Sequence, residues 1–282
     1  MKLISFRIDG KATYGAIAGE GVVDLGARLG AKYPDLKSLL AGPGLAEAQA
    51  ALKGARVEAK LEAVTLLPVI PNPGKIFCIG HNYEEHRLET ERDPTAHPSV
   101  FLRLPESQVG HGQPILCPRE SAQLDYEGEI AIVIGKPGRR IAEGEAWAHV
   151  AGYSCYNDGS VRDWQRHTGQ FTPGKNFVAT GAFGPWLVPA GEIPAGERLT
   201  LATRLNGKVM QEGATEMMIF PVPRLIAYCS TFLPLATGDV IVTGTPGGVG
   251  ARRTPPVYMK PGDVVEVEVS RIGVLRNTIA VD

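Results

Sequence analysis

Short apolar runs bounded by turn residues constrain what most of this chain can fold into. Seven of them follow residue 66: KIFCIG, QPILC, EIAIVIG, GPWLV, LTLATRLNG, DVIVTG and DVVEVEV. Runs of this length are typical of β-strands, and 34 glycines and 22 prolines supply the turns between them. In this part of the chain, periodicity predicts helices over 220–232 and 142–152. Because helices do not alternate with these strands, a doubly wound sheet is disfavoured and a mixed or antiparallel β architecture is predicted.

The first 66 residues form a pattern of their own. KLISFRIDGKATYGAIAGEGVVDLG contains short alternating runs broken at Asp9-Gly10 and at 19–21, which indicates hairpins. Residues 45–64 are rich in Ala, Leu, Glu and Lys at helical spacing, which predicts a helix. Three prolines then follow at positions 68, 71 and 73, as in linkers between domains. We therefore predict a small N-terminal domain over 1–66 and a larger domain over 67–282.

Composition excludes several classes of protein. The chain is 44% hydrophobic and 21% charged, as soluble globular proteins are. A formal net charge of −1 gives no field that would favour nucleic acid or an anionic membrane. No apolar run is long enough for a membrane span, and the start lacks the apolar core of a signal peptide. The four scattered cysteines form no CxxC pair, which fits a reducing cytoplasm.

Three acidic residues indicate a metal site. Glu127 and Glu129 in LDYEGEIAIVIG share one strand face, roughly 7 Å apart along the strand. Asp158 follows in GYSCYNDGSVRDWQ. Carboxylates in an apolar run are unfavourable unless a positive charge compensates them, and oxygen ligands suit Mg²⁺ first, then Mn²⁺ or Ca²⁺. The alternative is that both glutamates are solvated on an edge strand.

A histidine and a glutamate could form a general base. His86 and Glu89 in GHNYEEHRLETERDPTAH lie three residues apart, so on a helical turn they face the same side. A carboxylate that accepts from one imidazole nitrogen makes the other a better base. The alternative is a surface helix whose His and Glu meet only solvent. The stretch is polar and contains Pro94, so it could also be a loop that closes over a substrate.

Two cations and a threonine complete the candidate site. Arg162 follows Asp158 by four residues, and Lys175 lies in TPGKNF. Such cations would serve an anionic substrate or a developing oxyanion, although a structural ion pair, for example Arg162 with Asp163, explains them equally well. Residues 243–250, TGTPGGVG, lack the pattern of a nucleotide-binding loop. Thr245 in this turn could hold a substrate oxygen; the alternative is a plain glycine turn between strands.

The order of these motifs resembles the fumarylacetoacetate hydrolase family. The resemblance runs from about residue 67 to the C-terminus through KIFCIGHNYEEHRLE, LDYEGEIAIVIG, GYSCYNDGSVRDWQ, PGKNF, GPWLVP, GDVIVTGTPGGVG and KPGDVVEVEV. It is nearest to short bacterial members with a small N-terminal domain. The resemblance implies an α+β fold that is predominantly β, a mixed β-sandwich roll preceded by a small N-terminal α/β domain. It also implies a homodimer that binds a small oxo acid.

The resemblance also assigns roles to residues. It makes Glu127, Glu129 and Asp158 the metal ligands, and His86 with Glu89 the base that activates water. It gives Lys175 the stabilisation of an enolate or oxyanion. The substrate contacts that it implies are Arg162, Gln165 and Thr245. Asp125 shares the strand face of the two glutamates by parity, but it lies outside the family's ligand set, so we expect it to be structural.

The reaction implied is the Mg²⁺-dependent hydrolysis of a carbon–carbon bond in a 1,3-diketo acid, either an acylpyruvate or a diketo-deoxy sugar acid. One alternative keeps the scaffold and changes the reaction, giving an oxaloacetate decarboxylase, a keto–enol tautomerase or a hydroxymuconate-type isomerase. A second alternative is a metal-stabilised binding protein without turnover, because fold alone does not establish catalysis.

The chain departs from the family pattern at three places. Arg103 stands where the family often has lysine, which keeps the charge but changes the hydrogen-bond geometry. His81 replaces a common leucine or arginine. Val178 and Ala179 replace an acidic and a hydroxyl residue. We therefore expect substrate choice to depend on the N-terminal domain, on 90–97 and on 178–183.

Overall fold

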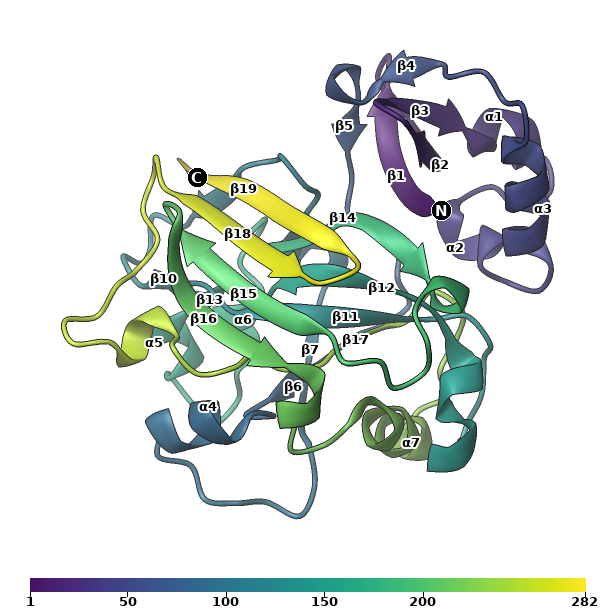
Figure 1. The fold of residues 1–282 in the computed structure, drawn as a ribbon. Coiled ribbons are helices and arrows are strands. Elements are labelled where there is room, and N and C mark those ends of the chain that lie inside the picture. The colour runs from purple at the N-terminus through teal and green to yellow at the C-terminus, as the bar shows by residue number, and fades with distance from the viewer.

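The computed structural model describes residues 1–282, and its architecture is α+β with β-strands predominating (Figure 1). A large mixed sheet has the strand order β4-β3-β2-β1-β14-β12-β11-β17-β6-β7, with β5 and β8 attached at its side. A second sheet has the order β16-β15-β18-β19-β9, and β10 pairs only with β13. The predicted fold class is confirmed, and no doubly wound sheet is present.

The strands of the three sheets have the following bounds. The large sheet contains β1 (Lys2–Ile8), β2 (Lys11–Ala18), β3 (Gly21–Asp24), β4 (Ala59–Lys60), β5 (Thr65–Leu66), β6 (Ile76–Gly80), β7 (Ser99–Arg103), β8 (Gln108–Val109), β11 (Gly128–Ile134), β12 (Val150–Asn157), β14 (Gly181–Pro189) and β17 (Val240–Val242). The second sheet contains β9 (Ile115–Cys117), β15 (Thr200–Leu205), β16 (Lys208–Ala214), β18 (Val264–Val269) and β19 (Gly273–Val281). The two-strand sheet contains β10 (Leu124–Asp125) and β13 (Ser160–Val161).

Helices are few and mostly short. The α-helices are α1 (Leu25–Leu29), α2 (Leu36–Leu39), α3 (Gly44–Leu52), α4 (Glu84–Glu89), α5 (Arg162–Gln165), α6 (Thr172–Lys175) and α7 (Val222–Phe232). The 3₁₀ helices are η1 (Leu61–Ala63), η2 (Pro105–Ser107), η3 (Glu143–His149), η4 (Ala190–Glu192), η5 (Thr215–Met217) and η6 (Gly250–Arg252). None of them combines the length and the apolar composition needed to span a bilayer.

The two large sheets pack face to face and enclose the main core. Strands β11, β12 and β14 lie against β15, β18 and β19, as Figure 1 shows. Ile130 and Ile132 of β11 and Val265 and Val267 of β18 belong to the same buried cluster. Gly128 is required at this contact, because a Cβ there would lie 2.0 Å from Thr203 Oγ1. Since side chains alternate along the chain, the residues on either side of Gly128 point away from the second sheet.

The N-terminal residues lie beside the main body (Figure 1). Both predicted hairpins are present in this part of the chain, with Ile8 opposite Lys11 and Ala18 opposite Gly21. Strand β1 joins the large sheet by pairing with β14, and a second buried cluster, which includes Leu3 and Val242, spans both parts. The domain boundary at residue 66 stays a prediction.

Two predicted helices differ from the structure. The helix predicted over 45–64 ends at Leu52, because the backbone is already extended at Lys53 (φ −66°, ψ 114°), and Gly54 follows in a left-handed conformation (φ 69°). The helix predicted over 142–152 is the 3₁₀ helix η3, which gives way to β12 at Val150. The helix predicted over 220–232 is confirmed as α7, whose apolar face buries Leu225, Ile226 and Cys229.

Gly159 directly follows Asp158 of the candidate site and packs closely against the backbone of Thr180, so its replacement tests this packing. A Cβ at this position would lie 1.9 Å from the carbonyl oxygen of Thr180. We expect Gly159→Ala to lower the free energy of unfolding by about 1–3 kcal/mol, as overpacking does. Urea denaturation measures this. The control is Gly144→Ala, whose Cβ would meet nothing within 4 Å. Equal stability of the two variants would contradict the packing described.

Candidate active site

Glu127, Glu129 and Asp158 come together where two central strands end. Glu127 directly precedes β11, Glu129 lies in it, and Asp158 directly follows β12. Gly128 pairs with Asn157 across these antiparallel strands, which brings the acids together. One carboxylate oxygen from each lies within 4.8 Å of the others. All three residues are at most 4% exposed and β11 is flanked by two strands, so the alternative of solvated glutamates on an edge strand is wrong.

Buried cations hold two of these carboxylates. Lys175 Nζ lies 2.6 Å from Glu127 Oε2 and 2.7 Å from Asp158 Oδ2. Arg162 Nη1 lies 2.6 Å from Glu127 Oε1. Burial alone would raise the pKa of Glu127, but Lys175 and Arg162 outweigh it and hold the pKa below its usual range. Burial likewise opposes the charge of Lys175, yet Asp158 and Glu127 raise its pKa. Both groups are therefore charged at neutral pH.

Arg103 holds Asp158 from the other side. Its Nη1 donates to Asp158 Oδ1 at 2.5 Å and to the Gly159 carbonyl at 2.9 Å. The remaining donors reach Ser107 and Thr180 Oγ1, so a guanidinium that is 1% exposed is fully used. A lysine could not supply this fork of donors, which gives the departure from the family pattern at this position a structural meaning.

Glu129 differs from the other two acids because no cation reaches it. Its Oε2 accepts a hydrogen bond from the Gly244 amide, and no salt bridge involves it. Burial, together with Asp158 and Glu127, raises its pKa well above the usual value. The buried cluster has four carboxylates and only three cations, so Glu129 is left without a cation partner and its charged form is disfavoured unless a further cation binds. The carboxylates are Asp125, Glu127, Glu129 and Asp158, and the cations are Arg103, Arg162 and Lys175.

These residues fit a hard divalent cation. Three buried carboxylates offer only oxygen ligands, the kind that Mg²⁺, Mn²⁺ and Ca²⁺ take in proteins. An uncompensated carboxylate such as Glu129 is unfavourable in a buried position, and a cation would remove that penalty. The donor set therefore supports metal binding, and it does not choose among the three ions.

His86 and Glu89 form the predicted pair on α4. His86 Nδ1 lies 2.7 Å from Glu89 Oε1, and Glu89 Oε2 accepts from the Gly248 amide at 2.9 Å. The carboxylate therefore places the proton on Nδ1 and leaves Nε2 with its lone pair, and Nε2 makes no hydrogen bond within the protein. His86 is 4% exposed and lines the cavity beside Glu127, so the alternative of a solvent-facing pair is wrong.

His81 stacks on His86. The ring centroids lie 5.3 Å apart with an interplanar angle of 12°. Burial, with a smaller contribution from His86, lowers the pKa of His81 to about 4. The His81 ring is therefore neutral at physiological pH and adds no charge next to the base.

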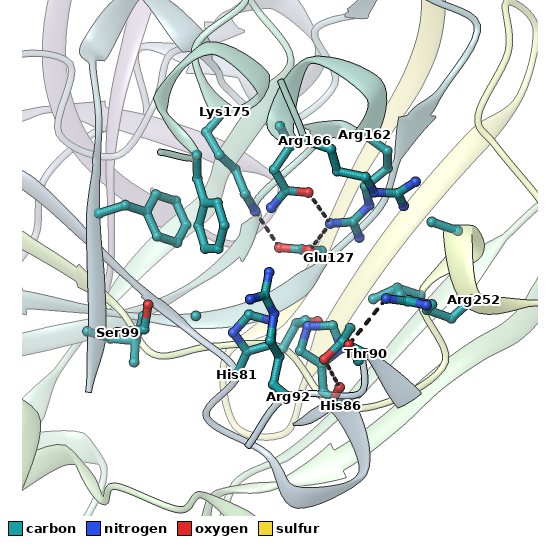
Figure 2. A pocket seen from close by; sticks show the side chains of 18 of the residues that line it. His81, His86, Thr90, Arg92, Ser99, Glu127, Arg162, Arg166, Lys175 and Arg252 are labelled. Atoms are coloured by element: carbon teal, nitrogen blue, oxygen red, sulfur yellow. Dashed lines mark hydrogen bonds and ion pairs between the residues drawn. The ribbon is translucent and has the colours of Figure 1, made fainter. Parts of the chain in front are cut away.

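A cavity of about 420 Å³ contains these groups (Figure 2). Seven of the nine residues predicted for the site line it: His86, Glu127, Glu129, Arg162, Gln165, Lys175 and Thr245. Glu89 and Asp158 do not line it, but each holds a residue that does. Nothing from 1–66 or 178–183 reaches the cavity, so the expectation that these segments set substrate choice is not supported, whereas Arg92 from 90–97 does line it.

The three residues predicted to contact the substrate already form hydrogen bonds within the protein. Arg162 Nε donates to Asp125 Oδ2 at 2.8 Å, and Arg162 does not pair with Asp163. Gln165 Oε1 accepts from Arg162 Nη1 at 3.0 Å. Thr245 Oγ1 donates to the Gly128 carbonyl and accepts from Gln211 Nε2, so its hydroxyl serves the β11 backbone.

Asp125 has the structural contacts expected of it. In addition to Arg162, it accepts from the amides of Gly250 and Ala251 and so fixes the start of η6. Sequence reasoning did not single out the cavity arginines Arg92, Arg166 and Arg252, because each lies in an irregular or short segment where no regular spacing assigns a side chain to the cavity.

Comparisons with known proteins agree with this geometry. The fumarylacetoacetate (FAA) hydrolase C-terminal family matches residues 75–280. The oxaloacetate tautomerase YisK of Bacillus subtilis is 44% identical over 223 residues, which cover 78% of this chain and 74% of that protein.

Two solved structures share the fold. A probable 2-hydroxyhepta-2,4-diene-1,7-dioate isomerase from Mycobacterium abscessus has a TM-score of 0.82 and 33% identity, over 100% of this chain and 99% of that one. Maleylpyruvate hydrolase from Sphingobium sp. SYK-6, in complex with manganese(II) and pyruvate, has a TM-score of 0.83 and 28% identity, over 99% of each chain. Tautomerases and isomerases thus outweigh hydrolases among these relatives, which favours the alternative reaction over carbon–carbon hydrolysis.

Removal of Arg103 should destabilise the protein strongly. Arg103→Met leaves the Asp158 carboxylate buried with one fewer cation, and breaking a buried ion pair costs about 3–5 kcal/mol. Urea denaturation of the metal-free protein checks this. Arg224→Met is the matched control, because Arg224 pairs with Glu143 in solvent and such pairs contribute little. Similar losses in both variants would contradict the role given to Arg103.

His81 should make folding sensitive to mild acid. Its pKa is about 4 in the folded chain, compared with 6.5 for an ordinary histidine. Between these values the unfolded chain binds more protons, so the free energy of unfolding falls as the pH falls. His81→Asn, which suits the left-handed backbone there (φ 56°), should lose stability less steeply over this range. Urea denaturation at several pH values compares the slopes, and equal slopes would refute the assignment.

Proposed function

This chain belongs to the fumarylacetoacetate hydrolase family, and we propose that it is a divalent-metal-dependent tautomerase of a small enolisable 2-oxo acid, with oxaloacetate as the first candidate. The observation that carries the proposal is the imidazole of His86, oriented by Glu89, with its free nitrogen facing the cavity that Glu127 and Glu129 line. The 44% identity to an oxaloacetate tautomerase supports the choice of reaction.

Tautomerisation needs one proton acceptor that can also act as donor. The enol loses its O–H proton and a proton is added at carbon 3, while the double bond between carbons 2 and 3 becomes single and the oxygen on carbon 2 becomes a carbonyl. No carbon–carbon bond breaks and no water is added. His86 Nε2 is suited to accept a proton, because the Glu89 carboxylate stabilises the positive charge that the ring then carries. The same nitrogen can return the proton, so the pair provides both steps without a second acid.

Lys175 and the metal site bind and polarise the substrate in this proposal. A lysine ammonium has three donors, and two of them are directed to Glu127 and Asp158. The third is available to a substrate oxygen, because Lys175 lines the cavity. Glu127, Glu129 and Asp158 would hold the cation, with Mg²⁺ as our first choice. When bound, that cation acts as a Lewis acid that lowers the energy of the enolate form.

Hydrolysis of a carbon–carbon bond is the second candidate. The pair of His86 and Glu89 could deprotonate water as well as an enol, and the Sphingobium hydrolase has the same fold. Decarboxylation of oxaloacetate on the same residues is a further outcome to be measured.

A homodimer and a cytoplasmic location, which the sequence predicts, also stay predictions.

The decay of the enol band of oxaloacetate in the near ultraviolet tests the proposal. The protein with Mg²⁺ should accelerate the decay, and a chelator should abolish the effect. Total oxaloacetate should stay constant and no carbon dioxide should be released. Carbon dioxide release would indicate a decarboxylase, and two acids formed from an acylpyruvate would indicate a hydrolase. No effect on any of these compounds would refute an enzymatic role.

Two substitutions should separate proton transfer from metal binding. We expect His86→Ala to lower kcat/KM by about 10²- to 10⁴-fold, the usual contribution of a general base, with little change in Mg²⁺ affinity. Glu129→Ala should remove both the activity and the Mg²⁺ affinity. Titration calorimetry measures the affinity, and Glu143→Ala, on the surface of η3, serves as the control. Equal loss of Mg²⁺ affinity in the first two variants would show that the roles are wrongly assigned.

A further inference from the structure

Three arginines line the cavity without a carboxylate partner: Arg92, Arg166 and Arg252. Arg92 lies beyond α4, Arg166 directly follows α5, and Arg252 ends η6. None of the three takes part in a salt bridge, and the only side-chain bond among them runs from Arg252 Nη2 to the Thr90 carbonyl at 3.2 Å. Figure 2 shows all three around the same hollow as Glu127 and His86.

A neighbouring arginine shows that this lack of partners is not general in the segment. Arg87, five residues before Arg92, forms a bidentate pair with Glu84, with bonds of 2.9 and 2.6 Å. Several acidic residues lie near Arg92 in the sequence, but none of them forms a salt bridge with its guanidinium. The guanidinium groups at the cavity are thus available to a ligand.

The charges of the cavity indicate what that ligand carries. With a divalent cation bound and all four buried carboxylates ionised, the cluster would have a net charge of +1, because the three buried cations and the metal together outweigh the acids. The three unpaired arginines add three positive charges around it. A 2-oxo acid with a single carboxylate would leave most of this charge without a partner. Guanidinium groups bind carboxylates through paired hydrogen bonds, so a second carboxylate is the group that they suit.

We propose that Arg92, Arg166 and Arg252 bind the second carboxylate of a dicarboxylic 2-oxo acid, so that the substrate is a dianion. This rests on the proposed function, because that function places the oxo-acid end of the substrate at Glu127, Glu129 and Asp158. The three arginines select the substrate and hold its far end, and they take no part in proton transfer.

Binding of two unreactive acids to the Mg²⁺-loaded protein tests the proposal. L-Malate and L-lactate share a 2-hydroxy acid end, and only malate has the second carboxylate. Titration calorimetry should show malate binding at least about tenfold more tightly than lactate, the value of one good charge-assisted hydrogen bond. Wild-type protein that fails to prefer malate overturns the proposal.

Substitutions then assign the preference to the arginines. Arg92→Gln, Arg166→Gln and Arg252→Gln should each weaken malate binding about three- to tenfold and leave lactate binding within about twofold. The triple variant should bind the two acids equally. Arg119→Gln, an exposed arginine outside the cavity, is the control and should change neither. Equal weakening of malate and lactate, or an unchanged preference in the triple variant, overturns the proposal.

These outcomes are distinguishable from failure of the proposed function. If the protein prefers malate through the arginines but does not tautomerise oxaloacetate, the dicarboxylate proposal stands and the proposed reaction is wrong. If the protein tautomerises oxaloacetate but does not prefer malate, the proposed reaction stands and the role given to the arginines is wrong. For an active enzyme, the three variants should raise KM for oxaloacetate and leave kcat nearly unchanged, which a structural effect on His86 would not produce.

Discussion

The structure depends on the burial of four carboxylates at the ends of two paired strands. Desolvation opposes each charge, and the fold offsets it with Arg103, Arg162 and Lys175, each in contact with one or two acids. Glu129 has no cation partner, and burial together with Asp158 and Glu127 raises its pKa well above the usual value. A cation bound there would stabilise its charged form, so the metal site follows from the missing partner and from the positions of the oxygens.

The sandwich explains why these groups are held rigidly. Gly128 lets β11 approach β15 closely; its carbonyl accepts a hydrogen bond from Thr245 and its amide donates one to Gln211 of β16. The neighbouring glutamates consequently project to the face where β12 ends at Asn157. Site residues carried on strands and helices are more precisely placed than residues on loops. Arg162 and Lys175 come from the short helices α5 and α6, and the base comes from α4, which Glu89 ties back to Gly248.

The periodicity of the sequence predicted contacts between residues that are close together in the chain. Strand alternation placed Glu127 and Glu129 on one face, and helical spacing paired His86 with Glu89, since both relations follow from backbone geometry. Asp158 stands in a separate motif, and the resemblance to a family gave it the role of a ligand; it reaches the two glutamates through the pairing of β11 with β12. Neither source could reveal the contact of Arg103 with Asp158 or the three cavity arginines, because such contacts depend on how distant segments are brought together.

The same base serves either a tautomerase or a hydrolase, so the choice between them depends on what reaches His86 Nε2. His86 is 4% exposed, with the neutral ring of His81 stacked on one face and Glu89 fixed at Nδ1. Hydrolysis requires a water held at Nε2 beside the substrate, whereas tautomerisation requires the substrate alone. Unpaired arginines that line the cavity would hold a dianion by its second carboxylate and so keep its enol against the base, which favours proton transfer within the substrate over attack by water.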